Sequence, residues 1–284
     1  MKKLLFFGLL GSFLFTACSV ETEVDTSAEN LSYDLANEEG SVIGIYKGVF
    51  TTNNAKHRGT VEIAVPNKAL RDNTRYKGMP RAKVTMHNGD VFYAKGTSNG
   101  IAGKAMSGVL FVSKQLSFTL SVDQDGTNPT IENVIFDSME GAILLAKHTK
   151  RAPVNARSGT WACTTCNGHP VVGQGGTQTF NMMFVTADGN STIMTQSTIN
   201  STVTDGIGVQ ENCSANGTTT VCDIISGDGS TTNTGFNSNG KPVTWSGTHT
   251  FNNEPSGVND CSTLSGTWQW PSNSYGLLTG NFIT

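Results

Sequence analysis

The sequence predicts an all-β protein with two antiparallel β domains, an N-terminal barrel or sandwich and a C-terminal β-sandwich. Three observations lead to this fold class. Short β-branched or aromatic runs, such as IYKGVF, AKVTMH and LSFTLSV, recur along the chain between Gly, Asn, Asp and Pro residues. In the first half of the chain, no window of 11 or more residues holds the apolar period of an amphipathic helix. The charge balance also changes abruptly near Pro153, which is typical of a boundary between domains.

Residues 1–17 have the pattern of a secretory signal peptide. Two lysines precede an apolar run over residues 4–15, and this run is shorter than the about 20 residues that a membrane-spanning helix needs. The run ends in FTAC, which resembles the lipobox of bacterial lipoproteins. The resemblance implies that Cys18 receives a diacylglyceryl group, becomes the new N-terminus and anchors the chain in a membrane. An ordinary signal peptide cleaved near Ala17 is the alternative.

Residues 18–40 contain many acidic residues and no basic one, so we expect a flexible tether that cannot bury enough apolar surface to fold. Acidic residues just after a lipidated cysteine resemble the surface-export signal of Bacteroidetes lipoproteins. Asp137-Ser138-Met139 resembles the short O-glycosylation motif of the same phylum. These resemblances imply a lipid-anchored cell-envelope protein, in the outer membrane and exposed at the surface. A plain solvated linker is the other interpretation of the tether.

Residues 41–152 form the predicted N-terminal β domain. Between residues 47 and 151, 15 Lys and Arg stand against 8 Asp and Glu. HNGD at 87–90 is its strongest hairpin turn, because Asn-Gly supplies the positive φ angles that a tight turn needs. The basic segment RDNTRYKGMPRAK, residues 71–83, is either a patch for an anionic polymer or a solvated loop. Nucleic acid is not an expected partner of an exported protein.

The segment DQDGTN, residues 123–128, resembles the start of a calcium loop. It lacks the later acidic ligand that would complete such a site, so the sequence favours a simple Asp-Gly turn after the strand LSFTLSV.

Residues 155–284 form the predicted C-terminal domain, which follows a linker within KHTKRAPVNARSG. SGTW occurs at 158–161 and again at 265–268, and GTQTFN at 176–181 is repeated as GTHTFN at 247–252. The order of the two motifs is mirrored, whereas a tandem duplication would preserve it. We therefore expect a single β-sandwich in which the first and last strands lie close together and the GTxTFN strands take corresponding inner positions.

All four tryptophans lie in this second half. Trp161, Trp245, Trp268 and Trp270 either fill the core, as in most sandwiches, or form a face that binds glycans. In GTWQWP, Trp268 and Trp270 point to the same side of their strand. Trp245, Trp268 and Trp270 are accordingly the candidate ligand-binding residues, and the core interpretation is favoured.

Five cysteines follow Cys18, and disulfide bonds are the default outside the reducing cytosol. The candidates are Cys163, Cys166, Cys213, Cys222 and Cys261. Cys213 and Cys222 flank a hairpin with Asn216-Gly217 at its turn, and we expect them to bridge it. Cys261 is expected to pair with Cys163 or Cys166 across the mirrored strands.

The motif CTTCNGH leaves two alternatives to a disulfide. Cys163, Cys166 and His169 are residue types that bind zinc, although their spacing is shorter than that of most structural sites. A redox dithiol would need Cys163 at a helix N-terminus, and the breakers after Cys166 argue against a helix there. No metal and no cofactor is predicted.

No catalytic motif is present: the chain has no GxSxG, HExxH or P-loop pattern, and no catalytic residues are predicted. As a whole pattern, SGTWxCxxC, GTQTFN, DCSTLSGTW and a terminal GNF resemble secreted or lipid-anchored Bacteroidetes proteins of unknown function. We expect a lipid-anchored envelope protein that acts by binding a glycan or another envelope protein. A hydrolase acting on envelope or extracellular polymer is the first alternative, and a structural or assembly lipoprotein is the second.

Overall fold

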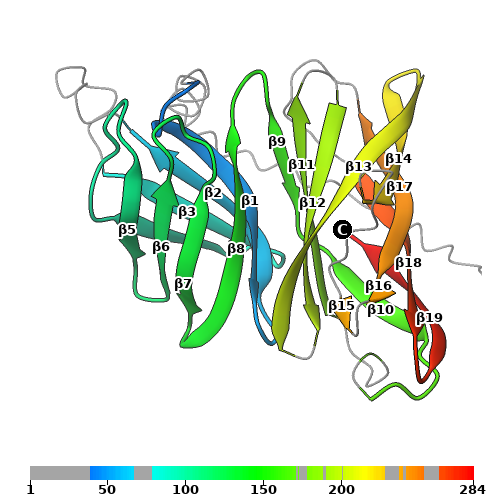
Figure 1. Ribbon diagram of the computed structural model, residues 1–284. Helices are drawn as coiled ribbons and strands as arrows, with labels where there is room; N and C mark the ends of the chain where they lie inside the picture. Colours follow the sequence, from blue (N-terminus) through cyan, green and yellow to red (C-terminus); the bar gives the residue numbers. More distant parts are fainter. Residues whose placement is uncertain are drawn as a thin grey trace, which may run out of the picture.

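The structure is a computed structural model that describes residues 39–66, 79–170, 172, 178–187, 190–199, 201–227, 237–238, 241–252 and 262–284. Over these residues the regular structure consists of β-strands, and it forms two antiparallel β domains side by side (Figure 1). The predicted signal peptide, nearly all of the tether and residues 71–78 of the basic segment lie outside the described residues.

The N-terminal domain is a closed barrel, which decides between the two predicted architectures. Its strands are β1 (Gly44–Thr52), β2 (Arg58–Val65), β3 (Arg81–Met86), β4 (Val91–Gly96), β5 (Met106–Val112), β6 (Leu116–Val122), β7 (Thr130–Phe136) and β8 (Met139–His148). Each strand pairs with the next, and β8 pairs with β1 so that Gly48 lies opposite Leu145. Closure removes the exposed sheet edges that favour aggregation.

Strict alternation of side chains fills this barrel. In β2, buried and half-buried residues alternate along the whole strand, as expected where one face of a strand meets the core. Phe111 and Phe118 stack with ring centroids 4.9 Å apart, and both are fully buried. The expected turn at 87–90 is confirmed, with Gly89 at φ 89° and the Met86 N–H donating to the Asp90 carbonyl oxygen at 2.8 Å.

The segment 123–128 is a turn, as the sequence favours. The Asp125 carboxylate accepts hydrogen bonds from the Thr127 amide at 3.0 Å and the Thr127 hydroxyl at 2.7 Å. Asn128 Nδ2 donates to the Asp123 carboxylate at 2.8 Å. The carboxylates therefore hold the turn through local hydrogen bonds.

The C-terminal domain is built mainly from one continuous nine-stranded sheet. Its strands are β9 (Val154–Arg157), β10 (Thr160–Thr165), β11 (Gln178–Ala187), β12 (Asn190–Ile199), β13 (Thr202–Asn216), β14 (Thr219–Ser226), β17 (Thr244–Asn252), β18 (Thr263–Ser272) and β19 (Gly276–Ile283). A separate small sheet contains β15 (Asn237–Ser238) and β16 (Lys241–Pro242). The large sheet runs in the order β10-β19-β18-β17-β14-β13-β12-β11-β9, and β10 also pairs with β11.

β10, at one end of the sheet, also pairs with β11, which is next to the other end. The strands from β10 round to β11 therefore form a ring instead of two stacked layers. Thr160 lies opposite Thr179, and Trp161 lies opposite Gln178. The expected β-sandwich is thus replaced by a closed antiparallel sheet around one core. Glycines on the inner side leave room for the large rings of that core; Gly208, for example, faces the Trp245 indole.

The mirrored motifs have the predicted neighbourhood. Strands β10 and β18, which carry the two SGTW motifs, lie on either side of β19. Each of these two strands also pairs with a strand that carries a GTxTFN motif: β10 pairs with β11, and β18 pairs with β17. The indoles of Trp161 and Trp268 meet edge to face with centroids 5.2 Å apart. The first and last parts of this domain therefore share one core.

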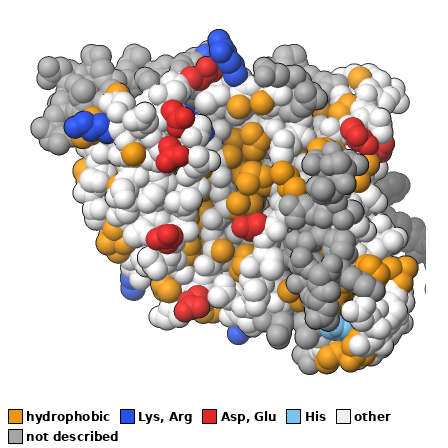
Figure 2. All heavy atoms as spheres, viewed as in Figure 1, with side chains coloured by type: hydrophobic (Ala, Val, Ile, Leu, Met, Phe, Trp, Pro, Cys, Tyr) orange, Lys and Arg blue, Asp and Glu red, His pale blue; other side chains and the backbone are white. Residues whose placement is uncertain are grey.

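The predicted linker is itself structured and joins the two domains. β9 pairs with β11 of the second sheet and also contacts β1 of the barrel. At this interface Val49 is completely buried, and the hydroxyls of Thr51 and Thr179 lie 2.8 Å apart. Hydrophobic side chains gather along the same seam in Figure 2. The domains are thus packed against each other.

Candidate functional site

The four tryptophans fill the core of the C-terminal domain. Trp161, Trp245, Trp268 and Trp270 are between 2 % and 4 % exposed. The alternative in which Trp245, Trp268 and Trp270 form an exposed binding face is therefore wrong. The large rings fit inside the sheet because glycines face them. A side chain at Gly266 or Gly280 would occupy the space taken by Phe282 or Trp268.

Two disulfide bonds are present among the described cysteines. Cys213 is bonded to Cys222 across the β13–β14 hairpin, as predicted, with the turn at Gly217 in a positive φ conformation. Cys163 is bonded to Cys166, so the expected pairing of either one with Cys261 is wrong. The physical reason is local. Strand β10 ends at Thr165, and a turn follows in which the His169 N–H donates to the Cys166 carbonyl oxygen at 2.8 Å. Cys261 lies outside the described residues.

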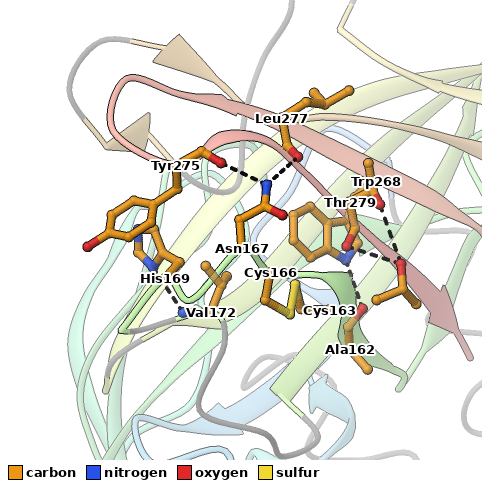
Figure 3. Close-up of a disulfide and its surroundings, with 11 residues drawn as sticks. Ala162, Cys163, Cys166, Asn167, His169, Val172, Trp268, Tyr275, Leu277 and Thr279 are labelled. Carbon is orange, nitrogen blue, oxygen red and sulfur yellow. Dashed lines mark hydrogen bonds between the residues drawn. A yellow bond between two sulfur atoms is a disulfide. The ribbon is translucent and has the colours of Figure 1, made fainter.

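The Cys163–Cys166 bond anchors the loop that carries His169 (Figure 3). The imidazole packs against the rings of Trp270 and Tyr275, with centroids 5.2 Å and 4.7 Å away. Its Nδ1 accepts the Val172 N–H at 3.3 Å, and partial burial lowers the pKa of His169. While the disulfide is intact, neither cysteine is a thiolate that could bind zinc. The redox alternative needs Cys163 at a helix N-terminus, whereas Cys163 lies within strand β10.

Asn167 in the same loop ties it to the closing strand. Its amide donates to the carbonyl oxygens of Tyr275 at 2.7 Å and Leu277 at 3.2 Å (Figure 3). The CTTCNGH motif therefore has a structural role as a clamp between β10 and β19. Over the described residues, no group of three or more His, Cys, Asp or Glu side chains is arranged to hold a metal ion.

The barrel carries opposite charges on opposite walls. Figure 2 looks onto the wall that contains β6, β7 and β8, where acidic side chains predominate. Half a turn around the closed barrel, β3 and β4 present Arg81, Lys83 and Lys95 outward, and all three are exposed. Three exposed cations are therefore grouped on this wall.

One exposed aromatic ring lies among these cations. Tyr93 on β4 is 62 % exposed and lies directly opposite Lys83 on β3. Lys95, two residues further along β4, lies opposite Arg81. Side chains directly opposite in antiparallel strands are in contact range, so the phenol ring has basic neighbours on its own strand and on the adjacent strand.

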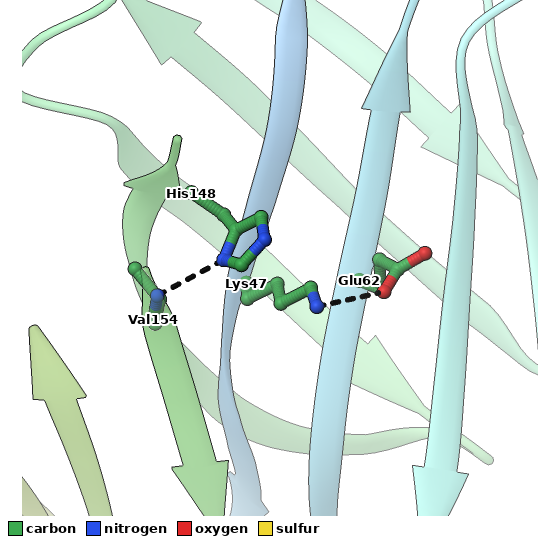
Figure 4. A network of polar contacts seen from close by, with 4 residues as sticks. All are labelled: Lys47, Glu62, His148 and Val154. Carbon is green, nitrogen blue, oxygen red and sulfur yellow. Dashed lines mark hydrogen bonds and ion pairs between the residues drawn. The ribbon is translucent and has the colours of Figure 1, made fainter. Parts of the chain in front are cut away.

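The same cross-strand row continues to the domain interface. Lys47, Glu62, Lys83 and Tyr93 lie opposite one another in turn across β1, β2, β3 and β4, and we call them the lysine–tyrosine row. Lys47 Nζ lies 3.7 Å from the Glu62 carboxylate (Figure 4). One carboxylate is thus placed between two lysines, which leaves a net positive charge.

A groove of about 260 Å³ lies over the inner end of this row, between the barrel and β9, and we call it the seam groove. It is lined mainly by polar groups. These are the side chains of Lys47, Thr60, Glu62, Lys83, Thr85 and Asn155, together with Val61, Val154 and Ala156.

His148 stands next to the seam groove and fixes the start of β9. Its Nδ1 accepts the Val154 N–H at 2.9 Å (Figure 4). Burial, with a smaller contribution from the Lys47 ammonium, lowers the pKa of His148 to about 4. The ring is therefore neutral at neutral pH and acts as a hydrogen-bond acceptor.

No model of a known protein family matches this chain, and comparisons with curated proteins and with solved structures also found no match. No helix long and apolar enough to cross a membrane occurs in the part of the chain that the structure describes.

Proposed function

We propose that this chain is a lipid-anchored cell-envelope protein that binds an acidic glycan along the lysine–tyrosine row and in the seam groove. The observation that carries the proposal is the exposed ring of Tyr93, placed in one row with Lys83 and the seam groove. A polysaccharide is long enough to occupy the groove and the exposed ring at the same time.

The chemistry of the row suits a sugar acid. An exposed tyrosine offers an apolar ring face, on which the C–H groups of a sugar can stack, and a polar hydroxyl. Lys83, Lys95 and Arg81 supply cations for carboxylate or sulfate groups. Thr60, Thr85 and Asn155 in the seam groove supply hydroxyl and amide groups that can exchange hydrogen bonds with sugar hydroxyls.

The number of carboxylates at this site favours a binding function over a hydrolytic one. Glycoside hydrolysis ordinarily needs two carboxyl groups on either side of the scissile bond. Among the residues that line the seam groove, Glu62 is the single acidic one, and it is paired with Lys47. This pairing suits electrostatic positioning of a ligand.

Glycan-array measurements on the detergent-solubilised chain test the proposal. We expect binding to uronate- or sulfate-bearing glycans but not to their neutral counterparts, and weakening at high salt because exposed charges are screened. Tyr93→Ala and Lys83→Gln should each weaken binding about tenfold, which corresponds to about 1.4 kcal/mol. Lys150→Gln, an equal charge change on the loop after β8, is the control.

The results also separate other partners. Equal binding to neutral and acidic glycans, or unchanged binding by Tyr93→Ala, would contradict the proposal. Binding to anionic lipid vesicles or to an envelope protein in place of glycans would assign the same surface to a different partner and would equally overturn it.

The membrane anchor is tested separately. Metabolic labelling with an alkyne-bearing fatty acid should mark the wild-type chain and not Cys18→Ser, which should also leave the membrane fraction. A labelled Cys18→Ser variant would refute lipidation at this residue. Proteinase treatment of intact cells would then establish whether the anchored chain is surface-exposed.

A further inference from the structure

A second pocket, of about 320 Å³, opens at the end of the barrel where three hairpin turns meet, and we call it the hairpin pocket. The β1–β2, β3–β4 and β7–β8 turns contribute its rim. Its lining residues are Lys56, His57, Arg58, Met86, His87, Asn88, Asp90, Phe92, Phe136 and Asp137. Its volume is in the range of sites that bind small molecules.

Aromatic side chains from two strands and a turn line one part of the hairpin pocket. Phe92 meets Phe136 edge to face with ring centroids 5.1 Å apart, and His57 packs on Phe136 at 5.0 Å. Phe136 is 1 % exposed and belongs to the barrel core, whereas Phe92 is only partly buried. The rigid barrel core thus supports an apolar surface that is open at Phe92.

Arg58 brings a positive charge to this apolar surface. Within the described residues its guanidinium forms no ion pair, and its Nε is buried without a hydrogen-bond partner. Burial also lowers the pKa of Arg58. A buried donor without an acceptor is unfavourable, so an anion that supplied acceptors would be bound favourably. The planar guanidinium fork matches a carboxylate best.

The other polar groups limit the charge of that anion. Burial and the Arg58 guanidinium lower the pKa of His87, so this ring is neutral at neutral pH. Asp90, which accepts Asn88 Nδ2 at 2.7 Å, and Asp137 also line the pocket. Lys56 also lines the pocket, so cations and carboxylates are equal in number there. The two carboxylates would repel a polyanion, whereas a single negative charge can be directed at Arg58.

We infer that the hairpin pocket binds a small ring-bearing monocarboxylate, with the ring against Phe92 and Phe136 and the carboxylate on Arg58. This site is separate from the lysine–tyrosine row, and it requires neither the glycan nor the membrane anchor. It makes the barrel a small-molecule receptor in addition to a surface-binding module.

Calorimetric titration of the full chain with benzoate, phenylacetate and indole-3-acetate tests the inference, with the corresponding amides as uncharged probes. We expect at least one carboxylate to bind at millimolar concentration and its amide to bind about tenfold more weakly, because charge-assisted hydrogen bonds are about twice as strong as neutral ones. Equal binding of acid and amide, or no binding by any of the acids, overturns the inference.

Variants locate the site. Arg58→Gln should weaken carboxylate binding about tenfold, whereas Arg81→Gln on the outer wall should not change it. Phe92→Leu, at the open part of the pocket, should weaken the acid and the amide equally, and it serves as a second test if Arg58→Gln does not fold. Unchanged affinity in both pocket variants overturns the assignment. Tyr93→Ala should bind the carboxylate probe with unchanged affinity, because Tyr93 does not line the hairpin pocket. A failure of the glycan proposal can therefore be distinguished from a failure of this inference.

Discussion

Asn181 on β11 donates a hydrogen bond from Nδ2 to the carbonyl oxygen of Phe50 on β1, at 3.0 Å and completely buried. The same amide nitrogen lies 3.2 Å from Gln196 Oε1, and Asn181 Oδ1 accepts the Gly159 N–H at 3.2 Å. One side chain therefore connects the two domains and also contacts Gly159, just before β10, and Gln196 on the neighbouring strand β12. This asparagine belongs to the first GTxTFN motif, which gives the motif a role at the domain interface.

Replacing Asn181 by Ala should lower the free energy of unfolding by about 2 kcal/mol or more. The change leaves buried polar partners without a hydrogen bond, and each such group carries a desolvation cost. Denaturant unfolding followed by intrinsic fluorescence measures the loss, and Thr192→Ala at an exposed position of β12 is the control. A loss no greater than that of the control would show that the Asn181 hydrogen bonds contribute nothing to stability.

The local pattern of the sequence predicts much of this fold. Alternation predicts the strands, and the turn at Asn88-Gly89 places Lys83 opposite Tyr93 by simple counting from the turn. The mirrored SGTW motifs correctly predict that β10 and β18 lie near each other. Each of these features depends on residues that are close in sequence or on a repeated pattern.

Long-range closure is less visible in the sequence. The β10–β11 pairing rests on a short ladder at Thr160 and Trp161, and no composition signal distinguishes it from the edge of a sandwich. The expected pairing of Cys163 with Cys261 is wrong because a local and a distant partner satisfy the same residue pattern. The seam groove and the hairpin pocket combine side chains from separate hairpins, so their positions follow only from barrel closure.

Gly280→Ala should destabilise the C-terminal domain by about 1 to 3 kcal/mol. A Cβ at this position would overlap the Trp268 indole and the Ala162 carbonyl oxygen, which themselves form a hydrogen bond at 3.3 Å. Overpacking of this kind forces side chains and backbone to shift. The thermal midpoint should fall accordingly, while Ser265→Ala on the exposed side of β18 should leave it nearly unchanged. An unaltered midpoint for Gly280→Ala would mean that the inner glycine is not tightly packed.

The two disulfides should differ in their contribution to stability. Cys213 and Cys222 are nine residues apart in sequence, whereas Cys163 and Cys166 are three apart. Loop-closure entropy then gives about 3 kcal/mol for the first bond and about 2 kcal/mol for the second. Paired Cys→Ala variants, compared in denaturant, measure the difference.

Thiol alkylation followed by intact-mass analysis checks the pairings themselves. Without reductant, Cys163, Cys166, Cys213 and Cys222 should resist alkylation, and all four should react after reduction. Alkylation of Cys163 or Cys166 in the unreduced chain would contradict the bond between them.

Acid should destabilise the chain partly through His148. Its folded-state pKa of about 4 lies below the value of about 6.5 expected in the unfolded chain. The folded state therefore favours the neutral ring, so this contribution is fully present above about pH 6.5 and is lost as the pH falls toward 4. Protonation at Nδ1 would break the bond from Val154 and place a second positive charge beside Lys47. The ring is partly exposed, so we expect a loss of about 1 to 2 kcal/mol after allowing for solvent screening.

The variant His148→Asn isolates this effect, because its amide oxygen can still accept the Val154 N–H but does not titrate. Between pH 7 and pH 4 the wild-type free energy of unfolding should fall by about 1 to 2 kcal/mol more than that of the variant. All other titrating groups are common to both chains and cancel in the comparison. Identical pH dependence in the two chains would show that His148 does not couple protonation to the junction between the barrel and β9.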